Sequence, residues 1–293
     1  MKYFENYIEI RKQKPVGLRD QLRTIALDGL SILDKLKGID ILLNKPRVQF
    51  LYLHHVFKEE EIKLDRLLKM LSLNHQFISY SEGVDKVLEN SIDKPYICFS
   101  LDDGFKNNLR AAEILNEYNA KACFFVNPSI VGLNTFNEIE KHCFERLQFP
   151  PVEFLNWNDI EKLQNMGHEI GSHTMDHIDI ANTEEDVFIE DCKKTFDILL
   201  KQCGEVNHFA LPYGRFGHFN EVAREIVFNS GFKSCATAER GCHINHDRLL
   251  LKQELCIRRD HIVLDWKTDH IIHFIAKNSK RATIANNLFP YLK

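Results

Sequence analysis

The sequence predicts an α/β fold with parallel strands, and three observations support this prediction. Short apolar runs alternate with segments in which apolar residues recur every three or four positions, as strands alternate with helices in such folds. Polar residues follow several of the apolar runs, as they do at the carboxyl ends of parallel strands. No internal repeat, low-complexity segment or flexible linker divides the 293 residues, so we expect a single domain over 1–293.

An N-terminal extension is expected before the first strand. Between 15 and 41 apolar residues recur at roughly helical spacing, which predicts one or two amphipathic helices. The recurring residues are Leu18, Leu22, Ile25, Leu30, Leu33 and Leu36. Because no residue in this region suggests chemistry, we interpret 1–45 as a helical extension that packs against the rest of the chain.

Strands and helices alternate from there on. Apolar runs rich in branched and aromatic residues predict strands, in order, at 48–53, 77–78, 96–101, 122–126, 169–172, 208–210, 233–238 and 250–257. Helical periodicity between them predicts helices at 59–74, 81–89, 107–118, 157–166, 184–201, 221–229 and 265–276. The segment 129–151 has mixed composition and ends in two prolines, so we expect an irregular insertion over one face. We divide the chain after the extension into a core over 46–260 and a C-terminal helix and tail over 261–293.

Composition excludes several classes of protein. The chain has 38 basic and 42 acidic residues without a long run of either sign, which argues against nonspecific nucleic-acid binding. The first ten residues include acids where a signal peptide needs an apolar region, and no uncharged run reaches membrane-spanning length. We therefore expect a cytoplasmic protein without a transmembrane segment. None of the eight cysteines forms a CxxC pair, so reduced thiols are expected.

Two adjacent carboxylates, Asp102 and Asp103, end the predicted strand at 96–101 and are followed by Gly104. Neighbouring carboxylates repel each other, so a fold keeps them at a strand end mainly when a cation or a reaction uses them. The alternative is a turn without chemistry, in which one carboxylate caps the helix predicted from 107.

Two histidines four residues apart, His173 and His177, form a second candidate. On a helical turn this spacing would place both imidazoles on one face, where they could hold one metal ion together with Asp103. The metalloprotease motif HExxH is excluded because Thr174 occupies the glutamate position. The alternative is that the pair is a chance occurrence among 14 histidines.

Three motifs in order resemble those of the polysaccharide deacetylase family, carbohydrate esterase family 4. They are Ser-Leu-Asp-Asp-Gly at 100–104, Gly-Ser-His-Thr-Met-Asp-His at 171–177 and Leu-Pro-Tyr-Gly at 211–214. The likeness runs from about 48 to 257. It implies a distorted (β/α) barrel of about seven parallel strands with the active site at the carboxyl ends of the strands.

The resemblance also implies roles for individual residues. Asp102 would be the general base, and the backbone N–H of Tyr213 would stabilise the oxyanion. One divalent metal ion, usually zinc in this family, would be bound by Asp103, His173 and His177. The residues assigned to substrate binding are Pro212, Gly214 and His54.

The sequence departs from the family pattern in two places. An arginine that often steadies the base is replaced by Ala210, and the candidates to replace it in space are Arg215, Arg258 and Arg259. The late Leu-x-His motif that carries the general acid in many members has no clean copy. Candidates by position are His243, His246, His261, His270 and His273.

The expected function is metal-dependent removal of an N-acetyl or N-formyl group from an amino sugar. The missing secretion signal favours a sugar nucleotide, lipid-linked or oligosaccharide substrate on the way to lipopolysaccharide or capsule, as in an intracellular branch of the family. An alternative is a metal- and carbohydrate-binding protein of the same fold with impaired catalysis, suggested by Ala210. A magnesium-dependent phosphotransfer enzyme ranks last, because no GxxxxGK[ST] loop is present.

Overall fold

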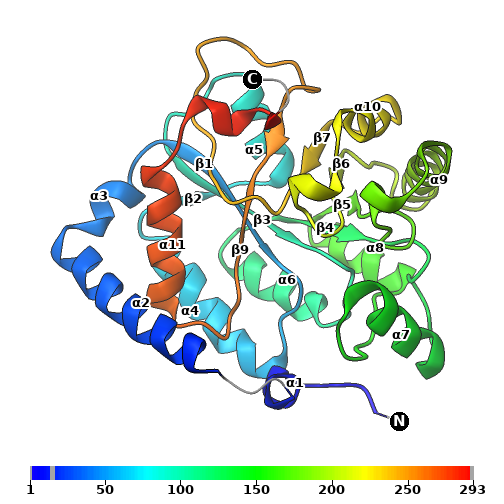
Figure 1. Ribbon diagram of the computed structural model, residues 1–293, viewed down its shortest axis with the longest axis horizontal. Coiled ribbons are helices and arrows are strands. Elements are labelled where there is room, and N and C mark those ends of the chain that lie inside the picture. Colours follow the sequence, from blue (N-terminus) through cyan, green and yellow to red (C-terminus); the bar gives the residue numbers. More distant parts are fainter. Residues whose placement is uncertain (1, 14–16, 291–293) are drawn as a thin grey trace.

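The computed structural model of the chain describes residues 2–13 and 17–290 (Figure 1). Within them, nine strands form one sheet in which every pairing between named strands is parallel. The strands are β1 (Arg47–Leu53), β2 (Gln76–Phe77), β3 (Pro95–Leu101), β4 (Ala122–Val126), β5 (Glu169–Ser172), β6 (His208–Ala210), β7 (Ser234–Ala236), β8 (Cys256–Ile257) and β9 (Arg259–His261). Eight of them follow the order β8-β7-β6-β5-β4-β3-β1-β9, and β2 pairs with β3 outside this path.

The two ends of the sheet meet through one extended segment. β8 pairs with β7 and β9 pairs with β1, and only Arg258 separates β8 from β9. The eight ordered strands therefore form a nearly closed barrel, which confirms the expected distorted barrel with one strand more than the seven expected. β9 is absent from the predicted strands because its charged residues do not form an apolar run.

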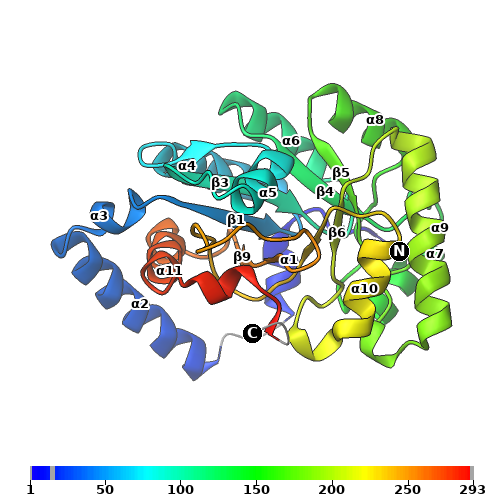
Figure 2. The same cartoon turned by 90° about the horizontal axis from the view of Figure 1, so that it is seen from above.

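Helices surround this barrel (Figures 1 and 2). They are α1 (Tyr7–Lys12), α2 (Leu18–Leu36), α3 (Ile39–Leu43), α4 (Glu61–Leu71), α5 (Tyr80–Leu88), α6 (Asn108–Glu117), α7 (Phe136–His142), α8 (Trp157–Asn165), α9 (Glu185–Cys203), α10 (Glu221–Asn229) and α11 (Thr268–Lys280). Among the described residues, no helix combines the length and apolar content needed to cross a bilayer.

The insertion at 129–151 is more regular than predicted. It contains α7 and a following π-helical turn, Cys143–Leu147. Ile139 and Cys143 anchor this segment in a small apolar cluster with Phe105, separate from the main core. The helix was missed because only a few of its residues are apolar and the following prolines suggested a loop.

The core has two layers, one on each face of the sheet. Outward-facing side chains such as Leu51 and Phe124 pack under the helices, whereas inward-facing ones such as Phe50 and Phe125 fill the barrel. Packing inside is close: a Cβ on Gly171 would lie 2.5 Å from the ring of Phe125. All eight cysteines are free thiols, in agreement with the sequence prediction.

The N-terminal extension forms α2 and α3 in the region where the periodicity predicted one or two helices, and α1 precedes them. Residues 15 and 16 of the predicted helical range, and 291–293 of the predicted tail, lie outside the described residues. The extension contacts the rest of the chain through α11, but the apolar residues that predicted the helix are exposed and face away from the barrel. The exposed fractions are 72% for Leu18, 58% for Leu22, 67% for Ile25, 42% for Leu30, 47% for Leu33 and 78% for Leu36.

Candidate active site

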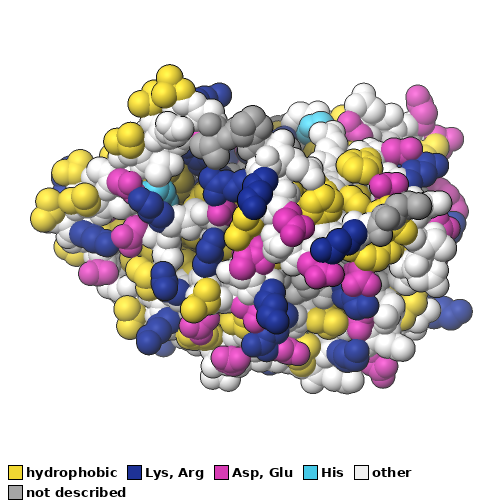
Figure 3. Space-filling model, turned by 90° about the horizontal axis from the view of Figure 1, so that it is seen from below, with side chains coloured by type: hydrophobic (Ala, Val, Ile, Leu, Met, Phe, Trp, Pro, Cys, Tyr) yellow, Lys and Arg dark blue, Asp and Glu magenta, His cyan; other side chains and the backbone are white. Residues whose placement is uncertain are grey.

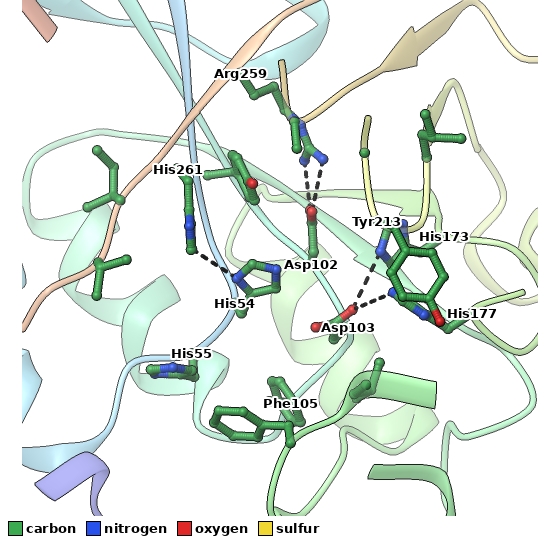
Figure 4. Close-up of a pocket in the computed structure, with 18 of the residues that line it drawn as sticks. His54, His55, Asp102, Asp103, Phe105, His173, His177, Tyr213, Arg259 and His261 are labelled. Carbon is green, nitrogen blue, oxygen red and sulfur yellow. Dashed lines mark hydrogen bonds and ion pairs between the residues drawn. The ribbon is translucent and has the colours of Figure 1, made fainter. Parts of the chain in front are cut away.

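A pocket of about 310 Å³ opens at the carboxyl ends of the strands (Figure 4). Its polar lining comes from different strand ends, as expected for a barrel of this kind. His54 follows β1, Asp102 and Asp103 follow β3, and His173 follows β5. These side chains are far apart in the sequence, and the parallel sheet brings them to one edge.

Asp103 faces the two motif histidines. Its Oδ1 atom lies 3.5 Å from Nε2 of His173 and 3.6 Å from Nε2 of His177. All three side chains are buried, and Oδ1 of Asp103 has no hydrogen-bond partner among the described residues. The predicted cluster is therefore present in space.

The histidines do not lie on a helical turn, as their spacing suggested. The segment after β5 is a turn in which Thr174 has a φ of 65° and His177 a φ of 50°. The side-chain amide of Asn127 donates to the carbonyls of His173 and Thr174, and the carboxylate of Asp191 accepts the N–H of Met175. These buried polar contacts hold a left-handed backbone that periodicity alone does not predict.

The geometry of this cluster fits a divalent cation. The three ligand atoms lie within 4.8 Å of one another. Ligand atoms about 2.1 Å from a tetrahedral zinc ion are about 3.4 Å apart, close to the two separations from Asp103 Oδ1. Nδ1 of His173 lies 2.7 Å from the carbonyl oxygen of Ala210, so a proton on Nδ1 leaves Nε2 free as a ligand. Burial lowers the pKa of His177 to about 4, which keeps that imidazole neutral and able to coordinate.

Asp102 is held by an arginine from β9, the strand that flanks β1 on the side away from β3. Nη1 and Nη2 of Arg259 donate to its two carboxylate oxygens at 2.7 and 2.9 Å, and both side chains are buried. Nε of Arg259 donates to the carbonyl of Thr237, and the guanidinium carbon lies 4.4 Å from the ring centroid of Tyr52. Burial alone would lower the pKa of Arg259, but the Asp102 carboxylate raises it. Of the three candidates to replace the arginine missing at Ala210, Arg259 is the one that contacts Asp102.

A pair of histidines, His54 and His261, lies on the side of Asp102 away from His173 and His177 (Figure 4). Nδ1 of His54 is 3.1 Å from Nε2 of His261, and both residues line the pocket. Burial lowers the pKa of each imidazole. The four other general-acid candidates are absent from the pocket lining: His243 contacts Asn287, His246 contacts Asp247, His270 contacts Asp28 and His273 contacts Asp34.

The third motif forms a tight turn at the pocket wall. Tyr213 has a φ of 59°, and its ring centroid lies 4.8 Å from that of His177. Gly214 also has a positive φ, and a Cβ there would lie 2.3 Å from Cβ of Ala238, so only glycine fits. Tyr213 and Gly214 line the pocket as predicted, whereas Pro212 is buried behind them and is absent from the lining.

Comparison with known proteins identifies the family of the chain. Residues 89–234, about half of the chain, match the family model described as polysaccharide deacetylase. The chain belongs to the polysaccharide deacetylase family. A peptidoglycan-N-acetylglucosamine deacetylase from Bacillus cereus is 30% identical over 139 residues, which are 46% of this chain and 42% of that protein. The chain thus spans less than half the length of this curated relative.

Solved structures of related proteins share the fold. IcaB from Ammonifex degensii has a TM-score of 0.62 at 20% identity and covers 80% of this chain and 98% of its own. The Streptococcus pyogenes deacetylase PplD, solved in complex with acetate, has a TM-score of 0.62 at 19% identity. The match covers 78% of this chain and 99% of PplD. The BpsB deacetylase domain from Bordetella bronchiseptica has a TM-score of 0.57 at 17% identity. The match covers 75% of this chain and 96% of that domain.

The pocket wall formed by Tyr7, His55 and Phe149 was not predicted from the sequence. Tyr7 of α1 lies against His55, with ring centroids 4.9 Å apart, and Phe149 from the insertion stacks on the same imidazole at 5.5 Å. His55 is anchored by Glu60, whose Oε2 lies 3.1 Å from its Nδ1. His55 directly follows His54 and was the only available signal, because neither Tyr7 nor Phe149 lies in a motif.

Proposed function

We propose that this chain is a metal-dependent carbohydrate N-deacylase, which hydrolyses an N-acetyl or N-formyl amide on an amino sugar. The observation that carries this proposal is the buried Asp103 oxygen that accepts no hydrogen bond and faces His173 and His177, next to an Asp102 carboxylate fixed by Arg259. Membership of the polysaccharide deacetylase family supports the class of substrate.

In this proposal Asp103, His173 and His177 hold one divalent cation, with zinc the best match to the donor set. The cation would supply Lewis acidity to polarise the amide carbonyl. Asp102 accepts a proton from the attacking water, and Arg259 keeps its carboxylate oriented. The backbone N–H of Tyr213 donates to the developing oxyanion, an interaction worth roughly 3 kcal/mol in other hydrolases.

The departing amine needs a proton, and His261 is the candidate donor. It is the one general-acid candidate of the five that lines the pocket, and His54 lies within hydrogen-bond distance of it. The remaining wall is aromatic, formed by Phe105, Phe149 and Tyr213, which suits the apolar face of a sugar ring. We assign His54, Tyr213 and Gly214 to substrate contact, and Pro212 to the shape of the turn behind them.

The substrate we propose is a saccharide used in building surface polysaccharide or lipopolysaccharide, carried as a sugar nucleotide, a lipid-linked sugar or an oligosaccharide. The relative from Bacillus cereus, whose name describes deacetylation of a cell-wall amino sugar, supports this choice. The alternative of a binding protein with impaired catalysis was suggested by Ala210, which stands where an arginine was expected to hold Asp102. Because Arg259 contacts Asp102 instead, this reason for the alternative is weaker.

The test is release of acetate or formate from N-acetyl and N-formyl amino sugars with added zinc. We expect turnover in the wild type and none after chelation. Binding of metal and sugar without turnover on either type of substrate would favour the alternative.

Variants of the four central residues separate metal binding from proton transfer. We expect Asp103→Ala, His173→Ala and His177→Ala to lower bound zinc, measured by elemental analysis after dialysis. Asp102→Asn should keep zinc and lose turnover. Asp176→Asn, which changes a partly exposed carboxylate in the same motif, is the control and should keep both.

A further inference from the structure

Helix α2 exposes its apolar face, whereas an ordinary surface helix buries that face against the core. Leu27 lies nine residues, about two and a half turns, from both Leu18 and Leu36, and is therefore on the opposite face. Leu27 is 8% exposed, whereas Leu18 and Leu36 are 72% and 78% exposed. The helix thus turns its apolar stripe outward, and Figures 1 and 2 both place it at the edge of the molecule.

The inward face of α2 docks through polar contacts. Asp28 accepts hydrogen bonds from Lys267 and pairs with His270, at 2.7 and 2.8 Å, and Asp34 pairs with His273 at 2.5 Å. These partners belong to α11 and to the residue before it. Two of the three acidic side chains of the helix, Asp28 and Asp34, are therefore paired with basic side chains of the protein, whereas Asp20 is exposed and accepts the N–H of Gly17.

The outward stripe is continuous and regular. Six of its members recur at alternating intervals of four and three residues from Leu18 to Leu36, Leu33 lies beside them, and Ile41 of α3, 71% exposed, extends the surface. We call this surface the α2 stripe; it consists of Leu18, Leu22, Ile25, Gly29, Ile32, Leu33, Leu36 and Ile41. Figure 3 shows apolar side chains gathered at the edge of the molecule where α2 and α3 lie. Arg19 and Lys37, both exposed, flank the stripe on one side.

We propose that the α2 stripe binds the surface of an anionic lipid bilayer, with α2 lying in the plane of the interface. An outward apolar face flanked by basic residues, with Asp28 and Asp34 paired away from it, is the pattern of helices that lie at the headgroup boundary. The flanking Arg19 and Lys37 complement anionic headgroups.

A second copy of the chain is the competing occupant, and the size of the stripe argues against it. A helix of 19 residues is about 28 Å long and about 10 Å wide. A strip of this size falls well short of the roughly 800 Å² per partner that a stable interface buries. A bilayer needs no such complementary area, because its acyl chains adapt to the side chains that enter.

The proposed orientation leaves the pocket accessible. Arg23, Thr24 and Leu27, on the side of α2 away from the stripe, line a cleft that shares Tyr7 and Phe149 with the active-site pocket. Lipid contact on the stripe therefore does not cover this cleft. Membrane binding is independent of the proposed reaction and is measured without it.

The test is flotation of the full chain with vesicles of phosphatidylcholine and phosphatidylglycerol at 7:3, compared with phosphatidylcholine alone. We expect the wild type to float with the anionic vesicles and to float less with the neutral ones. The double variant Leu22→Glu with Ile25→Glu should reduce the bound fraction at least tenfold. The matched control is Val187→Glu with Leu200→Glu on α9, which changes two exposed apolar residues on the far side of the barrel and should float like the wild type.

Circular dichroism and thermal unfolding verify that both double variants fold, as expected for exposed positions. Equal flotation of the stripe variant and the wild type, or no flotation of the wild type, would overturn the proposal. So would a lipid-free dimer in analytical ultracentrifugation that the stripe variant abolishes, because it would assign the stripe to a second copy.

Discussion

At the scale of single residues, the site depends on a pair that no motif contains. Arg259 and Asp102 are 157 positions apart and form two charge-assisted hydrogen bonds in a buried setting. The arginine that the family resemblance led us to expect at 210 is absent, and Arg259 on β9 contacts Asp102. A functional group can thus move to a different strand when both strands end at the same pocket.

Replacing this arginine should damage both stability and catalysis. Arg259→Gln leaves the buried Asp102 carboxylate without its cation, so we expect unfolding to become easier by about 3 kcal/mol. Misorientation of the base should lower kcat at least about a hundredfold. Urea unfolding and steady-state kinetics measure the two effects. Arg258→Gln, next in the chain but directed at Phe216 and the carbonyl of Asn286, should change kcat less than threefold; an equal loss in both variants would contradict the assignment.

His261 offers a second test at this scale. If it donates the proton to the leaving amine, His261→Gln should slow amide hydrolysis about a hundredfold. Hydrolysis of 4-nitrophenyl acetate should change little, because that leaving group departs without a proton. His246→Gln, which removes another candidate from outside the pocket, should leave both rates unchanged. Parallel loss on both substrates would assign His261 to pocket structure instead.

The residues predicted from the sequence were those that stand within motifs. Asp102, Asp103, His173, His177 and Tyr213 all lie at the pocket, because each motif spans or directly follows the carboxyl end of a strand. Arg259 and His261 could be named only among several candidates, since their position depends on which strand closes the barrel. That pairing is a long-range property of the sheet that local sequence does not encode.

At the scale of elements, buried polar residues tie strands to helices. His168 precedes β5; its Nδ1 accepts the N–H of Ala122 at 3.0 Å, and its Nε2 lies 3.2 Å from the carbonyl oxygen of Ala112 in α6. Burial lowers the pKa of His168 to about 4. One neutral imidazole thus joins β4, β5 and α6.

This histidine should make stability depend on pH in a predictable direction. Below pH 6.5 the unfolded chain binds a proton at His168, whereas the folded chain does so only near pH 4. Its contribution is therefore complete above pH 6.5 and is lost as the pH falls toward 4. Relative to His168→Gln, the wild type should lose about 2 kcal/mol of unfolding free energy between pH 7.5 and 5. Urea titrations of both proteins measure this difference, and a pH-independent difference would contradict the shifted pKa.

Elements were predicted well where apolar periodicity was strong and poorly where polar contacts decide the conformation. The boundaries of β1, β3 and β4 agree with the prediction within one residue. The turn that carries His173 and His177 was predicted as helical, because spacing cannot reveal the Asn127 and Asp191 contacts that hold it.

At the scale of the whole molecule, the parallel barrel followed from alternation of strands and helices together with the family resemblance. The sequence did not predict which way the apolar face of α2 points. Periodicity shows that α2 has such a face, but the direction of the face depends on tertiary partners. In this chain the polar side of α2 finds its partners on α11.

A bound metal should stabilise the entire barrel, because its ligands come from two strand ends. At a free zinc concentration a hundred times the Kd, binding contributes about 2.7 kcal/mol. Chelation should then lower Tm by roughly 5–10 °C. Differential scanning fluorimetry with and without a chelator measures the shift, which should vanish in His177→Ala and persist in Asp176→Asn.

The charges along β9, the strand that closes the barrel, also disfavour a misaligned register. Along β9, Arg259 and His261 point to the pocket, and Asp260 between them points outward to Gln49 and Asn278. If β9 slipped by one residue, side chains would exchange faces and Asp260 would meet Asp102. Two carboxylates would then face each other in a buried site, and a basic side chain would replace Asp260 beside Gln49. Electrostatic repulsion therefore penalises the misaligned barrel, so that the register which closes the sheet correctly is the same register that assembles the site.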